Sequence, residues 1–480
     1  MPVVRRTKIL ATVGPASDTP EQIARLIRAG ADAFRLNFSH GTDAEHRATL
    51  RRLRSARGLR GRELAIVGDV QGPKIRIGEL AGGRVTLRAG QSWVLDERAE
   101  PGDGQRVGVS IPGFARAAER GDPVILGDGN VMLEVRAASA RTITTRVTAG
   151  GAVTSHAGLF LPRAHLRTSV LGPKDRHDAR IAVAEGADFL ALSFVRSGDD
   201  LATTRRWLDR LPGGERVGLI AKIERAEALL NIDGILARAD GIMVARGDLG
   251  IEVPLERLAL EQKSLLRQAN TAGRFAIVAT QMLLSMLHAP RPTRAEATDV
   301  ANAVLDGADA VMLSEESAVG EYPVASVEWL ARIAAATEAA YDPGPVRVRA
   351  AAGATEGSAE RAVASAAVQL AESAHASAIM TPTHSGRTAM LVAALRPACP
   401  IVALSGHAPV RRRLALVGGV SAVESPAHLT LIELRKRAFA TARAAGVDGR
   451  GPIVLTAGYP IEGRPTNLVT VVEAPTESRP

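Results

Sequence analysis

The chain has 480 residues, of which 46% are hydrophobic and 23% charged, and its formal net charge is +9. At roughly 150 residues per domain this length predicts about three globular domains, and the apolar content excludes a disordered chain. No uninterrupted apolar stretch reaches the roughly 18 residues of a membrane helix, and the first residues lack a secretory pattern, so we expect a cytoplasmic protein without membrane contact.

Arginine strongly outnumbers lysine among the basic residues. Only six of the 60 are lysines, so composition alone would have placed arginine at any basic position, and each lysine is informative: Lys8, Lys74, Lys174, Lys222, Lys263 and Lys436. A positive chain attracts nucleic acid, membrane surfaces or phosphorylated metabolites. The aromatic content of 3% argues weakly against a base-stacking surface. The single cysteine, Cys399, excludes an intramolecular disulfide framework and a cysteine-rich metal site.

Eight short β-branched runs are predicted to be strands, and each is followed by a polar segment and a helical pattern. They are residues 7–14, 32–39, 63–70, 188–195, 216–224, 240–247, 275–282 and 309–316. Helix starts are indicated by Thr19 with Pro20 and Gln22, and similarly by the run from Pro292 to Glu296. Four strands follow an Ala-Asp pair, a weak internal repeat. Eight such units predict an α/β protein with a parallel (β/α)8 TIM barrel.

Two further domains are predicted beside the barrel. Short alternating strands over residues 79–162 indicate an all-β domain inserted in a barrel loop, where it would cover the active-site face as a lid. After Tyr341-Asp342-Pro343 the barrel pattern stops. Helices are predicted over residues 358–376 and 386–395, and strands over 377–381, 400–405, 451–458 and 468–474. We therefore assign the barrel to residues 1–78 and 163–343, the lid to 79–162 and an open α/β regulatory domain to 344–480.

Polar residues finish most of the predicted strands, and the active site of a barrel lies at these C-terminal ends. In strand order they are Arg35, Asn37, Ser39 and His40; Asp69, with Lys74 and Arg76 beyond it; Lys222 and Glu224; Arg246, Gly247 and Asp248; Thr280; and Ser314, Glu315 and Glu316.

Glu224 and Asp248 stand at the ends of adjacent predicted strands. Two hard oxygen ligands, completed by water and substrate oxygens, suit Mg²⁺. Lys222 points to the same face of its strand as Glu224, which places an ammonium beside that metal. A dication, a lysine and arginines form an electrostatic clamp for a transferring phosphoryl group. Ion pairs that merely close the barrel top could account for any one of these residues, but hardly for the set.

With this set of residues, the sequence resembles the pyruvate kinase family over essentially its whole length. The matching motifs are RLNFSHG (35–41), GPKIR (72–76), AKIE (221–224), DGIMVARGDLGIEVP (240–254), ATQML (279–283) and the run from PRPTRAE to GEYP (290–323). The resemblance implies transfer of the phosphoryl group of phosphoenolpyruvate to ADP, giving pyruvate and ATP in the last step of glycolysis. It also implies a homotetramer.

The resemblance assigns roles to matching positions. Lys222 would stabilise the phosphoryl group in the transition state, and Arg35 would grip the phosphate. Glu224 and Asp248 would hold Mg²⁺, for which Mn²⁺ can substitute. The carboxylate end of the substrate would be held by Thr280 and the backbone of Gly247 and Asp248, with Thr280 on the side of enolate protonation. The nucleotide would contact Asn37, His40, Arg76 and Lys174, and would bring a second Mg²⁺. His40 is equally well explained as a polar residue that caps its loop, and Pro173 alters the loop around Lys174.

Lys74 departs from the usual family pattern, which has glutamate there. Members with glutamate need K⁺, held by the equivalents of Asn37, Ser39 and Asp69 and by a backbone carbonyl. Val70, Gln71, Lys74 and Ile77 form the combination of potassium-independent members. A lysine ammonium is a compact monovalent cation. We therefore expect Lys74 to replace K⁺, which should not be required.

The C-terminal region offers a candidate effector site between a predicted strand and helix. Its hydroxyl and backbone groups would suit a phosphate: Thr383, Ser385, Gly386, Arg387 and Thr388. It resembles the family's loop for phosphorylated regulators such as a sugar phosphate or AMP, but an ordinary helix cap explains it equally well.

Two rival functions stay open. The first is another Mg²⁺-dependent barrel enzyme acting on phosphoenolpyruvate or a keto acid, which formation of ATP from ADP would exclude. The second is a non-enzymatic basic protein that binds nucleic acid, whose binding would depend steeply on salt. Such a protein has no need of Lys222, Glu224 and Asp248 together, so we expect no nucleic-acid partner.

Overall fold

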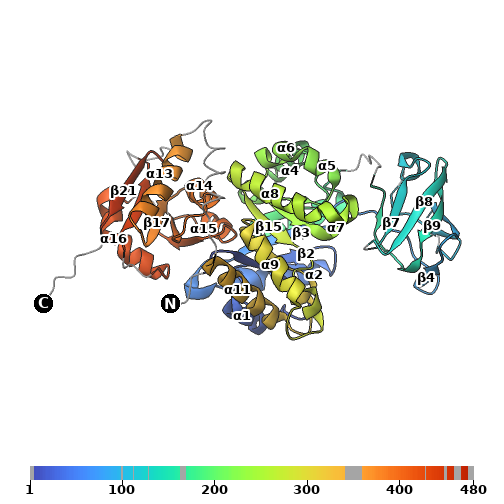
Figure 1. The fold of residues 1–480 in the computed structure, drawn as a ribbon, viewed down its shortest axis with the longest axis horizontal. Helices are drawn as coiled ribbons and strands as arrows, with labels where there is room; N and C mark the ends of the chain where they lie inside the picture. Colours follow the sequence, from blue (N-terminus) through green and yellow to red (C-terminus); the bar gives the residue numbers. More distant parts are fainter. Residues whose placement is uncertain are drawn as a thin grey trace.

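A computed structural model describes residues 5–98, 101–111, 113–127, 129–162, 169–340, 359–426, 429–447, 451–458 and 466–473. The predicted domain boundary at 343/344 lies outside these residues, as does the first barrel residue predicted after the lid, at 163. Within the described residues, no helix is both long and apolar enough to cross a membrane. Figure 1 shows three bodies in a row, with the barrel between a β insertion and a C-terminal α/β unit.

All eight predicted barrel strands form. They are β1 (Lys8–Val13), β2 (Ala33–Asn37), β3 (Ala65–Val70), β12 (Phe189–Leu192), β13 (Gly218–Ile223), β14 (Gly241–Ala245), β15 (Phe275–Ala279) and β16 (Ala310–Leu313). They close in the order β1-β16-β15-β14-β13-β12-β3-β2, and every neighbouring pair is parallel. The predicted (β/α)8 barrel is therefore confirmed.

Helices surround the barrel. The longer ones are α1 (Pro20–Ala29), α2 (Asp43–Ser55), α3 (Pro173–Ala184), α4 (Gly198–Leu208), α8 (Leu258–Ala272), α9 (Arg294–Leu305) and α11 (Pro323–Ala339), and the shorter ones are α5 (Ala226–Leu230), α6 (Ile232–Arg238), α7 (Arg246–Glu252) and α10 (Glu315–Ala318). The predicted cap Thr19 accepts a hydrogen bond from the Gln22 amide at 3.2 Å. At α9, Thr293 and Glu296 form a reciprocal capping box, and Pro292 precedes the cap instead of opening the helix.

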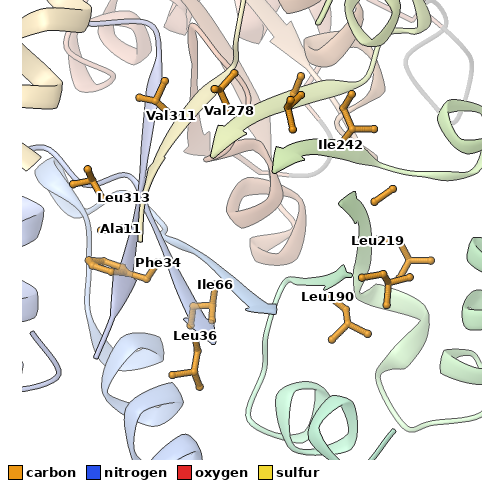
Figure 2. Packing of buried hydrophobic residues seen from close by; sticks show 14 of the residues in the cluster. Ala11, Phe34, Leu36, Ile66, Leu190, Leu219, Ile242, Val278, Val311 and Leu313 are labelled. Carbon is orange, nitrogen blue, oxygen red and sulfur yellow. The ribbon is translucent and has the colours of Figure 1, made fainter. Parts of the chain in front are cut away.

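Both faces of the barrel strands are buried, which explains their near-continuous apolar sequences. Side chains such as Ile66, Leu190 and Ile242 point outward and pack under the helices (Figure 2). The alternate residues, such as Val67, Ala191 and Met243, belong to a second buried cluster. The barrel is thus a packed core, and its charged residues, apart from Arg35 in the middle of β2, lie near the ends of the strands.

The Ala-Asp repeat has a structural role at the N-terminal ends of the strands. Each aspartate accepts a hydrogen bond from a backbone amide of the neighbouring strand: Asp32 from Ile9 at 2.9 Å, Asp188 from Ile66 at 2.9 Å, Asp240 from Leu219 at 2.7 Å and Asp309 from Ala276 at 2.9 Å. Two of these carboxylates also bind arginines of the C-terminal unit, Asp188 with Arg412 and Asp309 with Arg396. The repeat therefore joins strands to one another and the barrel to its neighbour.

The β insertion has strands β4 (Arg84–Leu87), β5 (Ser92–Asp96), β6 (Arg106–Gly108), β7 (Pro123–Leu126), β8 (Val131–Ala138), β9 (Thr142–Ala149), β10 (Gly151–Thr154) and β11 (Leu159–Phe160). They form a two-stranded sheet, β10-β4, and a six-stranded sheet, β11-β7-β8-β9-β5-β6. Trp93 is fully buried in its core. Arg76 and Ile77 already pair with Gly158 and Val109, so the chain joins the insertion slightly before residue 79.

The C-terminal unit is an open five-stranded sheet. Its strands are β17 (Ala378–Pro382), β18 (Ile401–Ser405), β19 (Val420–Glu424), β20 (Ile453–Ala457) and β21 (Leu468–Val472), in the order β19-β18-β17-β20-β21, and only β21 runs antiparallel to its neighbour. Its helices are α13 (Ala359–Ser373), α14 (Arg387–Ala394), α15 (Ala408–Leu414) and α16 (Leu431–Ala444). The predicted elements did not include β19, α15 and α16.

Candidate active site

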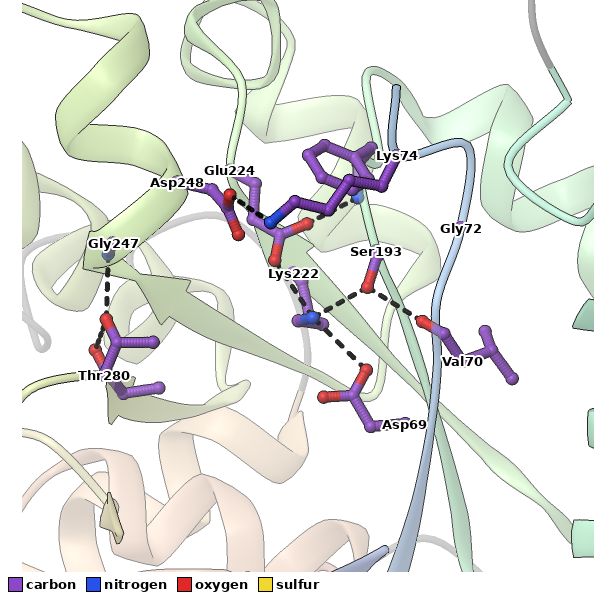
Figure 3. A network of polar contacts seen from close by, with 12 residues as sticks. Asp69, Val70, Gly72, Lys74, Ser193, Lys222, Glu224, Gly247, Asp248 and Thr280 are labelled. Atoms are coloured by element: carbon purple, nitrogen blue, oxygen red, sulfur yellow. Dashed lines mark hydrogen bonds and ion pairs between the residues drawn. The ribbon is translucent and has the colours of Figure 1, made fainter. Parts of the chain in front are cut away.

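Lys222 lies at the centre of a polar cluster at the C-terminal ends of the strands (Figure 3). Its ammonium is 3.2 Å from Asp69 Oδ1, 3.0 Å from Glu224 Oε1 and 2.7 Å from Ser193 Oγ. An ammonium has three N–H donors. In this structure three acceptors surround it: Asp69 on β3, and Ser193 and Glu224 directly after the ends of the neighbouring strands β12 and β13.

Asp69 holds two cations side by side. Its second oxygen, Oδ2, accepts a hydrogen bond from Arg35 Nε at 2.6 Å, and Arg35 Nη1 also donates to Thr12 Oγ1 at 3.1 Å. Burial alone would raise the pKa of Asp69, but Lys222 and Arg35 outweigh it and lower that pKa below its usual value. Burial would likewise lower the pKa of Lys222, but Asp69 and Glu224 raise it. The cluster thus presents two fixed positive charges around one carboxylate.

The two predicted metal ligands face the same region. Glu224 is buried, and its Oε2 accepts a hydrogen bond from the Phe194 amide at 2.7 Å. Burial raises the pKa of Glu224 and the charge of Asp248 adds to this, while Lys222 opposes it. Within the described residues no group of three or more histidine, cysteine, aspartate or glutamate side chains could hold a metal. Two carboxylates with open positions for water and substrate fit the ligand set of Mg²⁺.

Lys74 binds Asp248. Its ammonium lies 2.9 Å from Asp248 Oδ1 and 5.5 Å from the centre of the Phe160 ring, which belongs to the β insertion. We expected this charge near Asn37, Ser39 and Asp69. Both oxygens of Asp69 are instead occupied by Arg35 and Lys222, while Asn37 Oδ1 accepts a hydrogen bond from the Ser39 amide at 3.1 Å. Because the charge of Asp69 is already compensated by Arg35 and Lys222, the Lys74 ammonium is attracted more strongly to the carboxylate of Asp248.

Arg246 is turned away from the site. Its guanidinium binds both oxygens of Asp299, at 2.7 and 2.6 Å, and donates to the Thr280 carbonyl at 2.8 Å. The backbone of Thr280 is strained, with φ of 70°, a value that a β-branched residue rarely adopts. Its hydroxyl accepts a hydrogen bond from the Gly247 amide at 2.8 Å. Arg246 therefore supports the Thr280 turn instead of facing a substrate.

The predicted nucleotide contacts lie apart along the rim. Lys174 donates to the Phe38 carbonyl at 2.8 Å and to Asp178 at 2.6 Å, and Arg76 donates to the His156 carbonyl at 2.9 Å. The side chain of His40 is exposed, and its carbonyl accepts a hydrogen bond from a neighbouring histidine. Lys174 lies at the start of α3, whereas Arg76 lies where the chain enters the insertion. These residues border the site without contacting its central cluster.

The end of the eighth strand has a structural role. Glu316 is buried and accepts hydrogen bonds from the amides of Leu283, at 3.1 Å, and Ser314, at 2.7 Å. Its carboxylate is therefore used to join two loops.

The candidate effector loop in the C-terminal unit is internally bonded. Thr383 Oγ1 accepts from the Gly386 amide at 2.8 Å, and Thr388 and Thr466 share a hydrogen bond of 2.6 Å. Arg387 pairs with Glu360 at 2.6 Å, and Ser385 is exposed. These contacts are compatible both with a helix cap and with a phosphate site.

Sequence reasoning missed Ser193 and Phe194. The strand prediction ran through residue 195 and noted no polar group at its end, whereas β12 ends at Leu192. A serine at the end of an otherwise apolar barrel strand was the available signal.

The fold and the cluster define a class, the barrel phosphotransferases with an inserted β domain and a C-terminal α/β unit. Family models for "Pyruvate kinase, barrel domain" and "Pyruvate kinase, alpha/beta domain" match residues 4–327 and 361–472. The chain belongs to the pyruvate kinase family, and it is an enzyme of that family.

Individual relatives agree along nearly the whole chain. The pyruvate kinase of Geobacillus stearothermophilus is 40% identical over 474 residues, covering 97% of this chain and 80% of the relative. That of Methylorubrum extorquens is 40% identical over 474 residues and 97% of both chains. A solved pyruvate kinase structure from Cryptosporidium parvum matches with a TM-score of 0.92 and 33% identity, covering 98% of this chain and 96% of the other.

Proposed function

We propose that this enzyme transfers the phosphoryl group of phosphoenolpyruvate to ADP, giving pyruvate and ATP, with Mg²⁺ held by Glu224 and Asp248. The observation that carries the proposal is the position of the Lys222 ammonium between Asp69 and Glu224. A cation beside a pair of carboxylates at a barrel mouth suits phosphoryl transfer, which needs positioning and charge neutralisation more than covalent chemistry.

Arg35 and Lys222 bind the transferring group in this proposal. Because each donates to a different oxygen of Asp69, their positive charges are held close together before substrate arrives. Arg35 grips the phosphate, and Lys222 stabilises the charge that spreads over the phosphoryl oxygens in the transition state. Pre-organised charges need no rearrangement during the reaction.

The two carboxylates form the metal site of the proposal. Bound Mg²⁺, or Mn²⁺ in its place, supplies positive charge to the oxygens of the substrate. Glu224 and Asp248 would hold it, and the nucleotide would bring a second Mg²⁺. Burial raises the pKa of Glu224 because it disfavours the charged carboxylate. A bound cation would offset this cost and stabilise the carboxylate form.

Thr280 and the backbone of Gly247 and Asp248 hold the carboxylate end of the substrate. The Thr280 hydroxyl already bonds the Gly247 amide, so these groups are neighbours in the ligand-free chain. Thr280 lies on the side from which we infer that the enolate takes its proton, through water. Asn37, His40, Arg76 and Lys174 contact the nucleotide once the β insertion closes as a lid, which also excludes water.

K⁺ is not required in this proposal. Lys74 supplies a positive charge in place of the one that K⁺ gives to other family members, although its ammonium lies at Asp248 and not beside Asn37, Ser39 and Asp69. The contact of Lys74 with Asp248 keeps that charge at the metal site, next to the reacting groups.

The remaining assignments concern regulation and assembly. We infer a phosphorylated effector, a sugar phosphate or AMP, at the loop of Thr383, Ser385, Gly386, Arg387 and Thr388. A homotetramer is inferred from the resemblance to the family. A cytoplasmic location without nucleic-acid or membrane partners remains our prediction.

The decisive experiment measures pyruvate formation from phosphoenolpyruvate and ADP, coupled to lactate dehydrogenase. We expect activity that requires Mg²⁺ or Mn²⁺ and is abolished by a chelator. Glu224→Gln should lose both activity and metal binding measured by calorimetry. Pyruvate release without ATP formation would support another barrel enzyme and refute the proposal.

The effector loop needs a separate measurement. A panel of sugar phosphates and AMP should lower the phosphoenolpyruvate concentration for half-maximal rate, and Thr388→Ala should abolish that response. If no compound moves the curve, the loop is only a helix cap. Light scattering would test the tetramer, and a monomer at working concentrations would contradict it.

A further inference from the structure

The turn that follows β12 bonds two groups of the active site at once. Ser193 Oγ lies 2.7 Å from Lys222 Nζ, and the next residue, Phe194, donates its amide to Glu224 Oε2 at 2.7 Å. Figure 3 shows Ser193 between Lys222 and the end of β3. Two consecutive residues therefore fix the cation and one metal-site carboxylate.

The hydrogen bonds of Ser193 can run in only one direction. Its hydroxyl lies 2.8 Å from the Val70 carbonyl, which can only accept, so the single hydroxyl proton is donated there. A lone pair of the oxygen is then aimed at Lys222, which must be the donor. Ser193 is 2% exposed, so water does not compete for either bond. The Val70 carbonyl on β3 thus orients the hydroxyl, and the hydroxyl orients the Lys222 ammonium on β13.

The backbone around Ser193 is built for this placement. Phe194 has φ of 58°, a left-handed conformation that is unfavourable for an aromatic residue. Gly72 covers the serine with φ of 67°, and a Cβ at Gly72 would lie 2.9 Å from Ser193 Cβ. A strained turn and a close glycine contact hold the hydroxyl in one position.

Serine differs from the other two acceptors of Lys222 because it is neutral. Asp69 and Glu224 attract the ammonium, but they also offset its charge, and Glu224 is a proposed metal ligand. When Glu224 binds a metal, Ser193 and Asp69 remain to hold the ammonium. A neutral acceptor fixes the direction of the N–H groups and leaves the positive charge available to the phosphoryl group.

We propose that Ser193 is a positioning residue for phosphoryl transfer, which acts through Lys222 and does not touch the substrate. The inference rests on the proposed role of Lys222 in that reaction. Removing the hydroxyl lets the ammonium swing toward the carboxylates, and misplacement by about 1 Å can lower a rate about a hundredfold. We expect the loss in kcat, since the groups that bind ADP and metal are unchanged.

The test compares Ser193→Ala with Ser326→Ala. Ser326 is equally buried and donates to the Tyr322 carbonyl at 2.9 Å, but it has no bond to an ammonium. Ser193→Ala should lower kcat about tenfold to a hundredfold, with KM for ADP and the Mn²⁺ dissociation constant from calorimetry within about twofold of wild type. Ser326→Ala should retain wild-type kcat. Ser193→Cys fills the space with a thiol, which is a weak acceptor for Lys222 and a weak donor to Val70, and should resemble the alanine variant, so it serves if the latter does not fold.

Three outcomes would overturn the inference: a Ser193→Ala kcat within twofold of wild type, full activity in Ser193→Cys, or equal losses in the serine-to-alanine variants at 193 and 326. A parallel loss of Mn²⁺ affinity would also count against it, because it would assign Ser193 to the metal site. A wild-type protein that makes no ATP from phosphoenolpyruvate and ADP would instead refute the proposed function, so the two failures are distinguishable.

Discussion

Replacing Lys74 with glutamate tests the built-in cation directly. The substitution removes a positive charge 2.9 Å from Asp248 and puts a negative charge in its place, beside a proposed metal ligand. In the family pattern, glutamate at this position accompanies dependence on K⁺. We therefore expect the wild-type enzyme to be active without K⁺ and Lys74→Glu to require added K⁺.

The size of the effect follows from the geometry of the ion pair. Two unit charges about 3 Å apart interact by between about 1 and 6 kcal/mol as the effective dielectric constant falls from about 80 to about 20. The side chains of Lys74 and Asp248 are 25% and 23% exposed, and exposed pairs fall at the low end of this range. We take about 2 kcal/mol, which corresponds to a loss of about thirtyfold in kcat/KM without K⁺.

The assay compares tetramethylammonium chloride with KCl at constant ionic strength and saturating Mg²⁺. Wild type should be nearly equally active in both salts, and Lys74→Glu should recover most of its activity only in KCl. Lys263→Glu is the charge-matched control, because Lys263 pairs with Asp306 on the outer helices. Its response to K⁺ should not change.

Two results would refute this reasoning. One is a wild-type enzyme that is inactive until K⁺ is added. The other is a Lys74→Glu variant as active as wild type without K⁺, which would mean that the charge at position 74 does not act on the reaction.

Three other predictions concern stability and metal binding. Hydrogen bonds from Arg98, and then from Arg106, lower the pKa of Asp96 to about 2, although burial opposes this shift. The charged carboxylate should therefore stabilise the β insertion fully above about pH 4, and this stabilisation should be lost as the pH falls toward 2. Because both guanidiniums are about half exposed, Asp96→Asn should lower the free energy of unfolding by about 1 kcal/mol at pH 7 in urea titrations and remove this pH dependence. Asp309→Asn should lower the free energy of unfolding by about 3 kcal/mol, because it leaves Arg396, whose side chain is only 12% exposed, without its carboxylate partner. Combining it with Arg396→Met should cost less than the sum of the two single changes, and additive costs would contradict the pairing. Asp248→Asn should weaken Mn²⁺ binding at least tenfold in calorimetry, and unchanged binding would remove Asp248 from the metal site.

The barrel could be predicted because its strands carry a strong local signal. A strand buried on both faces is apolar at almost every position, as residues 65–70 and 241–245 show. Three of the surrounding helices, α1, α2 and α9, also begin at a threonine cap that is visible in the sequence. The strands and helices of the C-terminal unit were harder to predict. β19 has the short sequence VSAVE, which lacks that density of large apolar residues. Helix α16 carried a usable signal, since Thr430 and Glu433 form a capping box.

The residues of the site could be predicted as a set, but not their partners. Strand ends bring Asp69, Lys222 and Glu224 together in any barrel of this order, so their proximity follows from topology. The direction of Arg246 depends on Asp299, a residue on a helix 53 positions further along the chain. No local pattern reveals such a contact. The strained turn at Ser193 could not be predicted either, because it is held by Val70 and Gly72, which are far away in the sequence.

The choice of lysine in an arginine-rich chain follows the geometry of its acceptors. Lys222 is surrounded by three acceptors in a compact arrangement, and Lys8 donates to the Val420 carbonyl at 2.8 Å from a buried position. A planar guanidinium spreads its donors over a wider fork, which suits such compact surroundings less well than an ammonium. Lys263 and Lys436 lie on the surface, where this constraint is absent, so lysine marks a crowded site only where it is also buried. By that criterion, the partly buried Lys74 differs from the exposed Lys174, because its ammonium contacts both the Asp248 carboxylate and the Phe160 ring.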